Sequence, residues 1–101
     1  MPVKIEILPS ARGDLAEGFA FYEKQQRGLG TYFLNSLFAD IDSLTIHAGV
    51  HHRVLGAYRL LGRVFPFAVY YDVLNDVAKV KAVLDCRRDP KTIEKRLRRI
   101  G

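Results

Sequence analysis

The stretch from residue 59 to residue 90 reads RLLGRVFPFAVYYDVLNDVAKVKAVLDCRRDP. Short runs of apolar and aromatic residues alternate in it with turn residues, which is typical of antiparallel strands. The pattern predicts three strands joined by tight turns, followed by two arginines and a helix. The rest of the chain has to supply the elements that pack against this antiparallel meander.

The second hairpin takes its register from Asn75-Asp76, a dipeptide that favours a two-residue turn. This turn sets the facing pairs Leu74 with Val77, Tyr71 with Val80, and Tyr70 with Lys81. One face of the hairpin is then wholly apolar or aromatic, and we expect it to cover the core. That face carries Phe67, Val69, Tyr71, Val73, Ala78, Val80, Ala82 and Leu84. The opposite face carries Pro66, Ala68, Tyr70, Asp72, Lys79, Lys81, Val83 and Asp85.

The first hairpin is predicted to turn at Gly62-Arg63, because glycine suits the first position of a type II′ turn. This turn places Arg59 opposite Pro66, on the face that looks away from the core. It also adds two residues to the core face, Tyr58 and Leu60.

A candidate site follows from this register, because Arg59, Tyr70 and Lys81 share the sheet face away from the core. Arg87 and Arg88 lie just past the end of the sheet. Arginine suits bidentate contact with phosphate or carboxylate, tyrosine suits stacking on a base, and lysine supplies a point charge. The set predicts a platform for a nucleotide or another anion. The alternative is an ordinary polar sheet face, and a one-residue error in either turn would move these side chains to the core.

The first half of the chain predicts one strand and two helices. Residues 3–7 alternate apolar and polar side chains, as in a half-buried strand that Pro9 ends. Ser10 is placed to cap the helix that follows. Glycines at positions 28 and 30 separate it from a second helix, and so short a connection requires an antiparallel helical hairpin. The expected core residues of the two helices are Leu15, Phe19, Tyr22, Phe33, Leu37, Ile41 and Leu44.

A last helix is predicted to begin at the end of the quoted stretch. Asp89 is a good N-cap, and Pro90 suits the first helical position. An apolar stripe at helical spacing should dock on the body of the domain: Ile93, Leu97 and Ile100. Basic side chains then lie at or beside the solvent face: Lys91, Lys95, Arg98 and Arg99.

Positive charge is concentrated in this last helix and in the two arginines just before it. Residues 87–101 hold seven basic and two acidic side chains, which accounts for the whole net charge of +5. The first 86 residues balance, with nine basic and nine acidic side chains. The asymmetry indicates an anionic partner, either nucleic acid or an acidic protein. A solvated helix without a partner explains it equally well.

Length and composition set the class of protein. The 101 residues fit a single domain, residues 1–101, with one hydrophobic core. No stretch is apolar enough for a signal peptide or a membrane span, and the lone Cys86 suits a reducing cytosol, so we expect a cytoplasmic protein. We expect neither a cofactor nor a metal site, because His47, His51 and His52 lie near a predicted loop without further ligands.

The order of these motifs resembles the ParE/RelE superfamily of bacterial toxin–antitoxin toxins. The resemblance rests on an arginine strand, the stretch FPFAVYY at residues 65–71, and an apolar strand followed by RRDP at residues 87–90. It extends to the two helices through Asp14-Leu15, Phe19-x-x-Tyr22 and Gly28-x-Gly30-x-x-Phe33. It implies an α+β fold with an N-terminal strand, an antiparallel helical hairpin, a three-stranded antiparallel meander and a C-terminal helix.

The resemblance also implies a partner and two competing activities. The partner would be a small acidic antitoxin of the ParD type or a related one. RelE-like toxins cleave mRNA in the ribosome, with basic residues on the sheet face and a C-terminal tyrosine or histidine. ParE-like toxins, found in plasmid stabilisation modules, lack that set and are thought to inhibit DNA gyrase.

The ParE-like branch is the better match. Arg59 stands where the RelE pattern has its mid-sheet arginine, but no tyrosine or histidine follows Tyr71. The RRDP ending is also closer to ParE. The resemblance thus favours a gyrase inhibitor that is not an enzyme.

Two alternatives stay open. One is a metal-independent endoribonuclease with Arg59, Lys81 and Arg88 as catalytic residues, and the other is a degenerate member that binds antitoxin without toxicity. In all cases the residues expected to contact the partner or target are Arg59, Tyr70, Lys81, Arg87, Arg88, Arg98 and Arg99.

Overall fold

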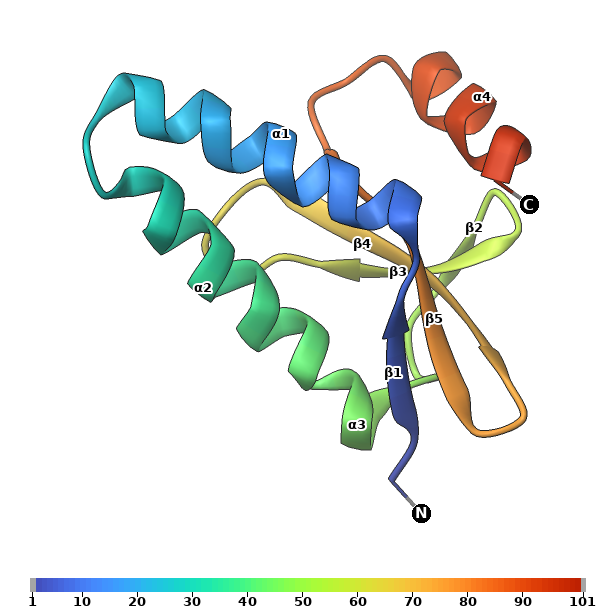
Figure 1. Ribbon diagram of the computed structural model, residues 1–101. Helices are drawn as coiled ribbons and strands as arrows, with labels where there is room; N and C mark the ends of the chain where they lie inside the picture. The colour runs from blue at the N-terminus through green and yellow to red at the C-terminus, as the bar shows by residue number, and fades with distance from the viewer. Residues whose placement is uncertain (1, 101) are drawn as a thin grey trace.

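The structure, a computed structural model, describes residues 2–100 (Figure 1). The strands are β1 (Lys4–Ile7), β2 (Arg53–Val54), β3 (Ala57–Leu61), β4 (Phe67–Leu74) and β5 (Val77–Asp85). The helices are α1 (Pro9–Gln25), α2 (Leu29–Asp42), α3 (Leu44–His47) and α4 (Pro90–Ile100). None of the described helices is both long and apolar enough to cross a membrane.

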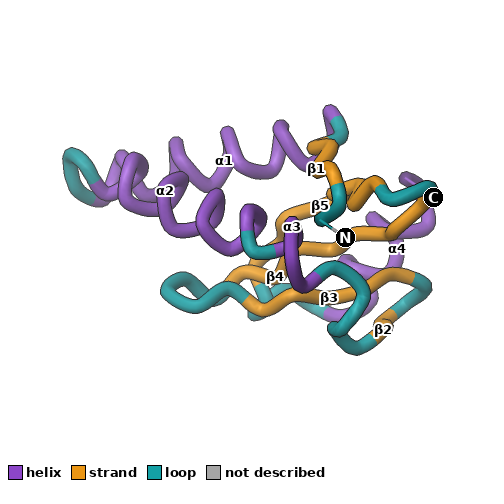
Figure 2. The backbone as a smooth tube through the Cα atoms, turned by 90° about the horizontal axis from the view of Figure 1, so that it is seen from below, coloured by secondary structure: helices purple, strands orange, loops and turns teal. Residues whose placement is uncertain are grey.

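The strands form one sheet in the order β1-β5-β4-β3-β2. β1 runs parallel to β5, whereas the other neighbours are antiparallel. The helical hairpin of α1 and α2 covers one face of the sheet, and α4 lies against the other (Figure 1, Figure 2). This arrangement confirms the predicted α+β fold and adds β2 and α3, which the sequence pattern did not predict.

Aromatic rings fill the space between the helical hairpin and the sheet. Phe33 is fully buried, and its ring centroid lies 4.9 Å from that of Phe67 and 5.2 Å from that of Tyr22. Gly18 lets α2 approach α1, because a Cβ at this position would lie 2.4 Å from the Phe33 ring. The predicted core residues of both helices are buried, except that Phe19 is half-buried.

The predicted turn at residues 75–76 is confirmed. Asn75 and Asp76 have φ angles of 51° and 61°, and a type I′ hairpin turn requires positive values at both positions. Val73 is an exception to the predicted core face, since it is partly exposed beside this turn. The core positions on which the register rested are buried: Phe67, Tyr71 and Val80.

A β-bulge between β4 and β5 changes the rest of the register. Tyr70 faces Ala82 instead of Lys81, because β5 accommodates one extra residue at this point. The alternation of β5 is inverted from there on. Val83 packs under the helical hairpin, whereas Ala82 and Leu84 face α4. The predicted faces of these three residues were therefore wrong.

The connection between β3 and β4 is longer than the predicted two-residue turn. It spans residues 62–66 and is closed by a 2.7 Å hydrogen bond from the Gly62 N–H to the Phe67 carbonyl oxygen. Arg59 consequently faces Tyr70 rather than Pro66, which corrects the prediction. The displacement is an even number of residues, so the two faces stay as predicted and the core side receives Tyr58 and Leu60.

The start of α1 lies along the edge of β5 and lacks the predicted serine cap. The helix begins at Pro9, and no side chain caps it. The Ser10 hydroxyl instead donates to the Lys81 carbonyl oxygen at 2.7 Å, and Asp14 accepts the Val83 N–H at 2.9 Å. These two side chains take over hydrogen bonding to β5 where β1 ends.

The beginning of α4 and its docking confirm the prediction. The Asp89 carboxylate accepts the Lys91 N–H at 2.9 Å, and Pro90 is the first helical residue. The predicted apolar stripe packs on the sheet: Ile93, Leu97 and Ile100.

Candidate anion-binding site

Arg59, Tyr70 and Lys81 lie on the sheet face away from the helical hairpin, as predicted. β3 brings Arg59 directly opposite Tyr70 on β4. Lys81 lies at the bulge of β5, with its ammonium group beside Asp72 on β4. Three adjacent strands therefore gather two cations and a phenol on one surface.

Helix α4 covers the phenol. The Tyr70 side chain is 2 % exposed and packs in a cluster that includes Ile93 and Leu97. Burial raises the pKa of the Tyr70 hydroxyl, and the neighbouring Arg59 guanidinium opposes the rise. The open stacking platform expected from the sequence is therefore not present in this arrangement, because α4 docks on the surface that the platform would need.

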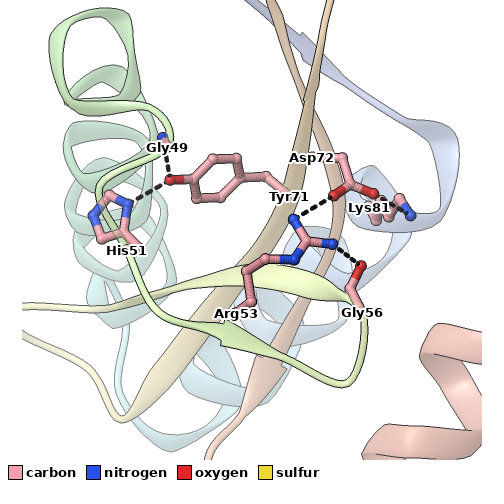
Figure 3. A network of polar contacts seen from close by, with 7 residues as sticks. All are labelled: Gly49, His51, Arg53, Gly56, Tyr71, Asp72 and Lys81. Carbon is pink, nitrogen blue, oxygen red and sulfur yellow. Dashed lines mark hydrogen bonds and ion pairs between the residues drawn. The ribbon is translucent and has the colours of Figure 1, made fainter.

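Lys81 is engaged within the protein. Its Nζ lies 2.7 Å from Oδ2 of Asp72 (Figure 3). Arg53 approaches the same carboxylate from β2 at 3.5 Å and also donates to the Gly56 carbonyl oxygen at 2.8 Å. Asp72 thus compensates part of the positive charge on this side of the sheet.

The two arginines after β5 differ in their availability. Arg87 donates twice to the Asp85 carboxylate, from Nε at 2.9 Å and from Nη2 at 2.6 Å. These hydrogen bonds lower the pKa of the Asp85 carboxyl group and hold the guanidinium in place. Arg88 is exposed and forms no ion pair with any described residue. Both arginines line a groove of about 350 Å³ between α1 and the end of β5, together with the carboxylates of Asp14, Glu17 and Asp85. Of the two arginines, Arg88 is therefore the one whose charge is not already paired.

Arg98 and Arg99 lie on the exposed side of α4, away from the other predicted contact residues. Arg98 pairs with Glu94 one turn earlier, and its side chain is 78 % exposed. Arg99 is also exposed. The apolar stripe of α4 lies between these arginines and the sheet. The predicted site residues therefore form two groups, one on the sheet face and one on the outer face of α4.

Sequence reasoning missed a buried ion pair between α4 and α1. Nη1 and Nη2 of Arg96 lie 2.7 and 2.8 Å from the Asp14 carboxylate, whose side chain is 4 % exposed. Arg96 also donates to the Ser10 carbonyl oxygen at 3.1 Å. The pair joins the two helices beside the edge of β5. Its signal in the sequence is an acidic residue at a core-spaced position of α1, next to Leu15.

A second polar contact fixes the loop after α3. The Tyr71 hydroxyl accepts the Gly49 N–H at 2.9 Å and lies 2.5 Å from Nδ1 of His51 (Figure 3). The Tyr71 hydroxyl therefore joins two parts of this loop, and the tautomer of His51 decides which group donates in the second contact. Burial and, to a smaller extent, His47 lower the pKa of His51. His51 thus has a structural role where the sequence indicated only a loop residue.

Side chains that could hold a metal are dispersed over residues 2–100. Within that range no three histidine, cysteine or acidic side chains lie close enough together to form a site. The cationic groups described above are the chemically distinctive feature of the surface.

Solved structures match this chain in fold, whereas no protein-family model and no curated protein sequence matches it. The structure of a chromosomal ParDE toxin–antitoxin system from P. aeruginosa matches with a TM-score of 0.74 and 14% identity, over 82% of this chain and 95% of that one. A double mutant of the E. coli toxin RelE in the free state matches with a TM-score of 0.50 and 15% identity, over the whole of both chains. This chain therefore has the fold that ParE and RelE toxins share, as the sequence resemblance implied.

Proposed function

We propose that this chain is the toxin of a bacterial type II toxin–antitoxin pair, acting in the cytoplasm and neutralised by a small acidic antitoxin of the ParD type or a related one. The observation that carries the proposal is the fold, because the similar structures are described as a ParDE system and the toxin RelE. The net charge of +5 supports an acidic partner.

An apolar groove on the helical hairpin suits that partner. The groove has a volume of about 430 Å³ and lies between α1, α2 and the end of β1. Phe19, Leu34 and Phe38 line it, and Phe38 is 41 % exposed. Arg12 lies at the groove and is exposed. An antitoxin helix with an apolar stripe and an acidic flank would bury the aromatic side chains and meet Arg12.

We further propose that the toxin inhibits DNA gyrase, as in plasmid stabilisation modules, and does not cleave RNA. Metal-independent RNA cleavage requires one group that takes the 2′-hydroxyl proton and another that stabilises the phosphate. No tyrosine or histidine follows Tyr71 in the sequence, Tyr70 is buried, and Lys81 is paired with Asp72. The sheet face thus supplies positive charge without an accessible base, which supports the non-enzymatic activity.

A RelE-like endoribonuclease is the second candidate. It is favoured by the shared sheet face of Arg59 and Lys81, with Arg88 just beyond the end of β5. In that case these three residues would be the catalytic set and would stabilise the phosphate in the transition state.

Induced expression in a bacterial host, with DNA, RNA and protein synthesis followed in parallel, separates these functions. Early arrest of replication with an SOS response supports gyrase inhibition, and early arrest of translation with cleaved mRNA supports the endoribonuclease. Growth without arrest contradicts both toxic activities and leaves a degenerate member that only binds antitoxin. Lys81→Ala should relieve a translational arrest, whereas the matched control Lys79→Ala should not, because Lys79 contacts Glu6 instead.

The antitoxin itself is tested by purification of the chain from its native host at low salt. A short acidic protein, encoded next to this chain, should copurify. Phe38→Glu places a charge in the groove and should release the partner, whereas Tyr32→Glu, at an exposed aromatic residue of the same helix that does not line the groove, should retain it. Full retention by Phe38→Glu would place the antitoxin elsewhere.

A further inference from the structure

We propose that the outer face of α4 binds the phosphodiester backbone of a nucleic acid. This inference goes beyond the toxin–antitoxin assignment. It uses the outer face of α4, which is separate from the apolar groove and shares only Arg88 with the second candidate function. The surface, called the basic row below, consists of Lys91, Lys95, Arg98 and Arg99, with Arg88 just before the helix.

Helical geometry places the basic row on one side of α4. At about 100° per residue, Lys91, Lys95 and Arg99 project within about 80° of one another and span about 12 Å along the axis. Ile93 and Leu97 project toward the opposite side and are buried on the sheet. The helix therefore presents its cations outward as a consequence of how it is docked.

Most of this charge is not compensated within residues 2–100. In that part of the chain α4 forms two ion pairs, Arg96 with Asp14 and Arg98 with Glu94. The first pair is internal, so it takes Arg96 away from the outer surface. The remaining cations are exposed and form no ion pair there: Arg88, Lys91, Lys95 and Arg99.

The chemistry of this face favours a nucleic acid over an acidic protein. Stable protein interfaces are centred on aromatic or aliphatic anchors. The aliphatic side chains of α4 all pack toward the sheet, which leaves the outer face without an anchor. A phosphate backbone requires only positive charge, and its binding is driven by release of counterions. Such a contact fixes position without reading sequence.

The test measures binding of the full chain to a labelled DNA duplex and to a labelled single-stranded RNA of arbitrary sequence, by fluorescence anisotropy at several salt concentrations. With three or four phosphate contacts, log K should fall with log salt with a slope of about −3 for the duplex. The double variant K95E/R99E should reduce the magnitude of that slope by about 2 and weaken binding at least about tenfold.

The matched control is K4E/R27E, which reverses one lysine and one arginine that are exposed on β1 and in the α1–α2 turn. It changes the net charge equally and should keep the parental slope. Equal losses in the two double variants would overturn the proposal, because binding would then depend on net charge alone. Absence of binding at low salt would overturn it as well.

Competition with polyglutamate of matched charge decides the class of partner. If polyglutamate displaces the labelled duplex as effectively as unlabelled DNA, the surface would be assigned to an acidic protein and the proposal would be overturned. A preference for DNA or for RNA supports it and identifies the source of the phosphates. The neutral variant K95Q/R99Q, checked by circular dichroism, should show about half the loss and keeps the test decisive if K95E/R99E does not fold.

Discussion

The two faces of the sheet are stabilised in different ways. The face under the helical hairpin is filled by large buried side chains such as Phe33, Phe67 and Tyr71. The face under α4 is lined largely by small ones: Ala57, Ala68 and Ala82. A single helix covers it, attached through three aliphatic residues and the pair between Arg96 and Asp14.

Because of this difference, the global stability of the fold and the local attachment of α4 should depend on different residues. A single unfolding curve does not distinguish the two. Global stability should reside in the aromatic face, because large buried rings contribute the most burial. The position of α4 should instead depend on a few contacts, one of them an ion pair between residues 82 positions apart in the sequence. The thin layer, which consists of α4 and the alanine-lined sheet face beneath it, is therefore the part of the molecule that a single substitution can loosen locally.

The largest effect is expected at the aromatic face. Phe33→Ala would leave a cavity between α1, α2 and the sheet, and should lower the free energy of unfolding by about 3–5 kcal/mol. Urea denaturation measures this loss. Phe38→Ala on the same helix removes a partly exposed ring and should cost much less. Similar losses in the two variants would show that the hairpin face is not the main source of stability.

The next effect is expected at the thin layer. Arg96→Ala leaves the buried Asp14 carboxylate without its cation and should cost about 2–3 kcal/mol, somewhat below the range for fully buried pairs because Arg96 is partly exposed. Hydrogen exchange should accelerate in α4 more than in β4. Arg98→Ala, which breaks the exposed pair with Glu94, should change stability by less than about 1 kcal/mol. Uniform acceleration over the chain would contradict a local role.

The smallest effect is a pH dependence at the loop that the aromatic face anchors. Burial lowers the pKa of His51 below its ordinary value of 6.5, so the unfolded chain takes up this proton at higher pH than the folded one. Stability from His51 is therefore complete above pH 6.5 and is lost as the pH falls toward the folded pKa. Unfolding measured from pH 7.5 to 5.5 should show this decline in the parent and in His52→Gln but not in His51→Gln.

A matching decline in His51→Gln would assign the pH dependence to another group. Burial raises the pKa of Asp40, which gives stability the opposite slope above pH 3.8. That contribution is common to both variants and to the parent. The difference between His51→Gln and the parent therefore isolates the histidine.

Local patterns predicted most of the fold. Helical spacing identified the buried faces of α1, α2 and α4, and Asn75-Asp76 identified the β4–β5 turn, because these features depend on residues close in sequence. The resemblance to ParE/RelE toxins then ordered the elements. The five-residue connection after β3 was missed because Gly62 also suits a tight turn.

The site was predicted less well, and for physical reasons. A β-bulge leaves almost no recognisable pattern in the sequence. The bulge near Lys81 nevertheless places Ala82, Val83 and Leu84 on the sheet faces opposite to those predicted. The common face of Arg59, Tyr70 and Lys81 survived because these residues precede the inversion. Tyr70 is buried because α4 docks over it. Hydrophobic periodicity predicts that α4 has an apolar side but not where on the sheet that side docks.

The parallel pairing of β1 with β5 has a consequence for synthesis. Lys4 lies opposite Val77, so β1 finds its neighbour only after the more than 70 residues between them have been translated. The helical hairpin leaves the ribosome long before β4 and β5, and its aromatic surface stays uncovered until they follow. Such non-local contacts form late and slowly. A chain released before residue 77 would lack β5, the strand that joins β1 to the sheet, so any activity that depends on this fold begins only after β5 has been made.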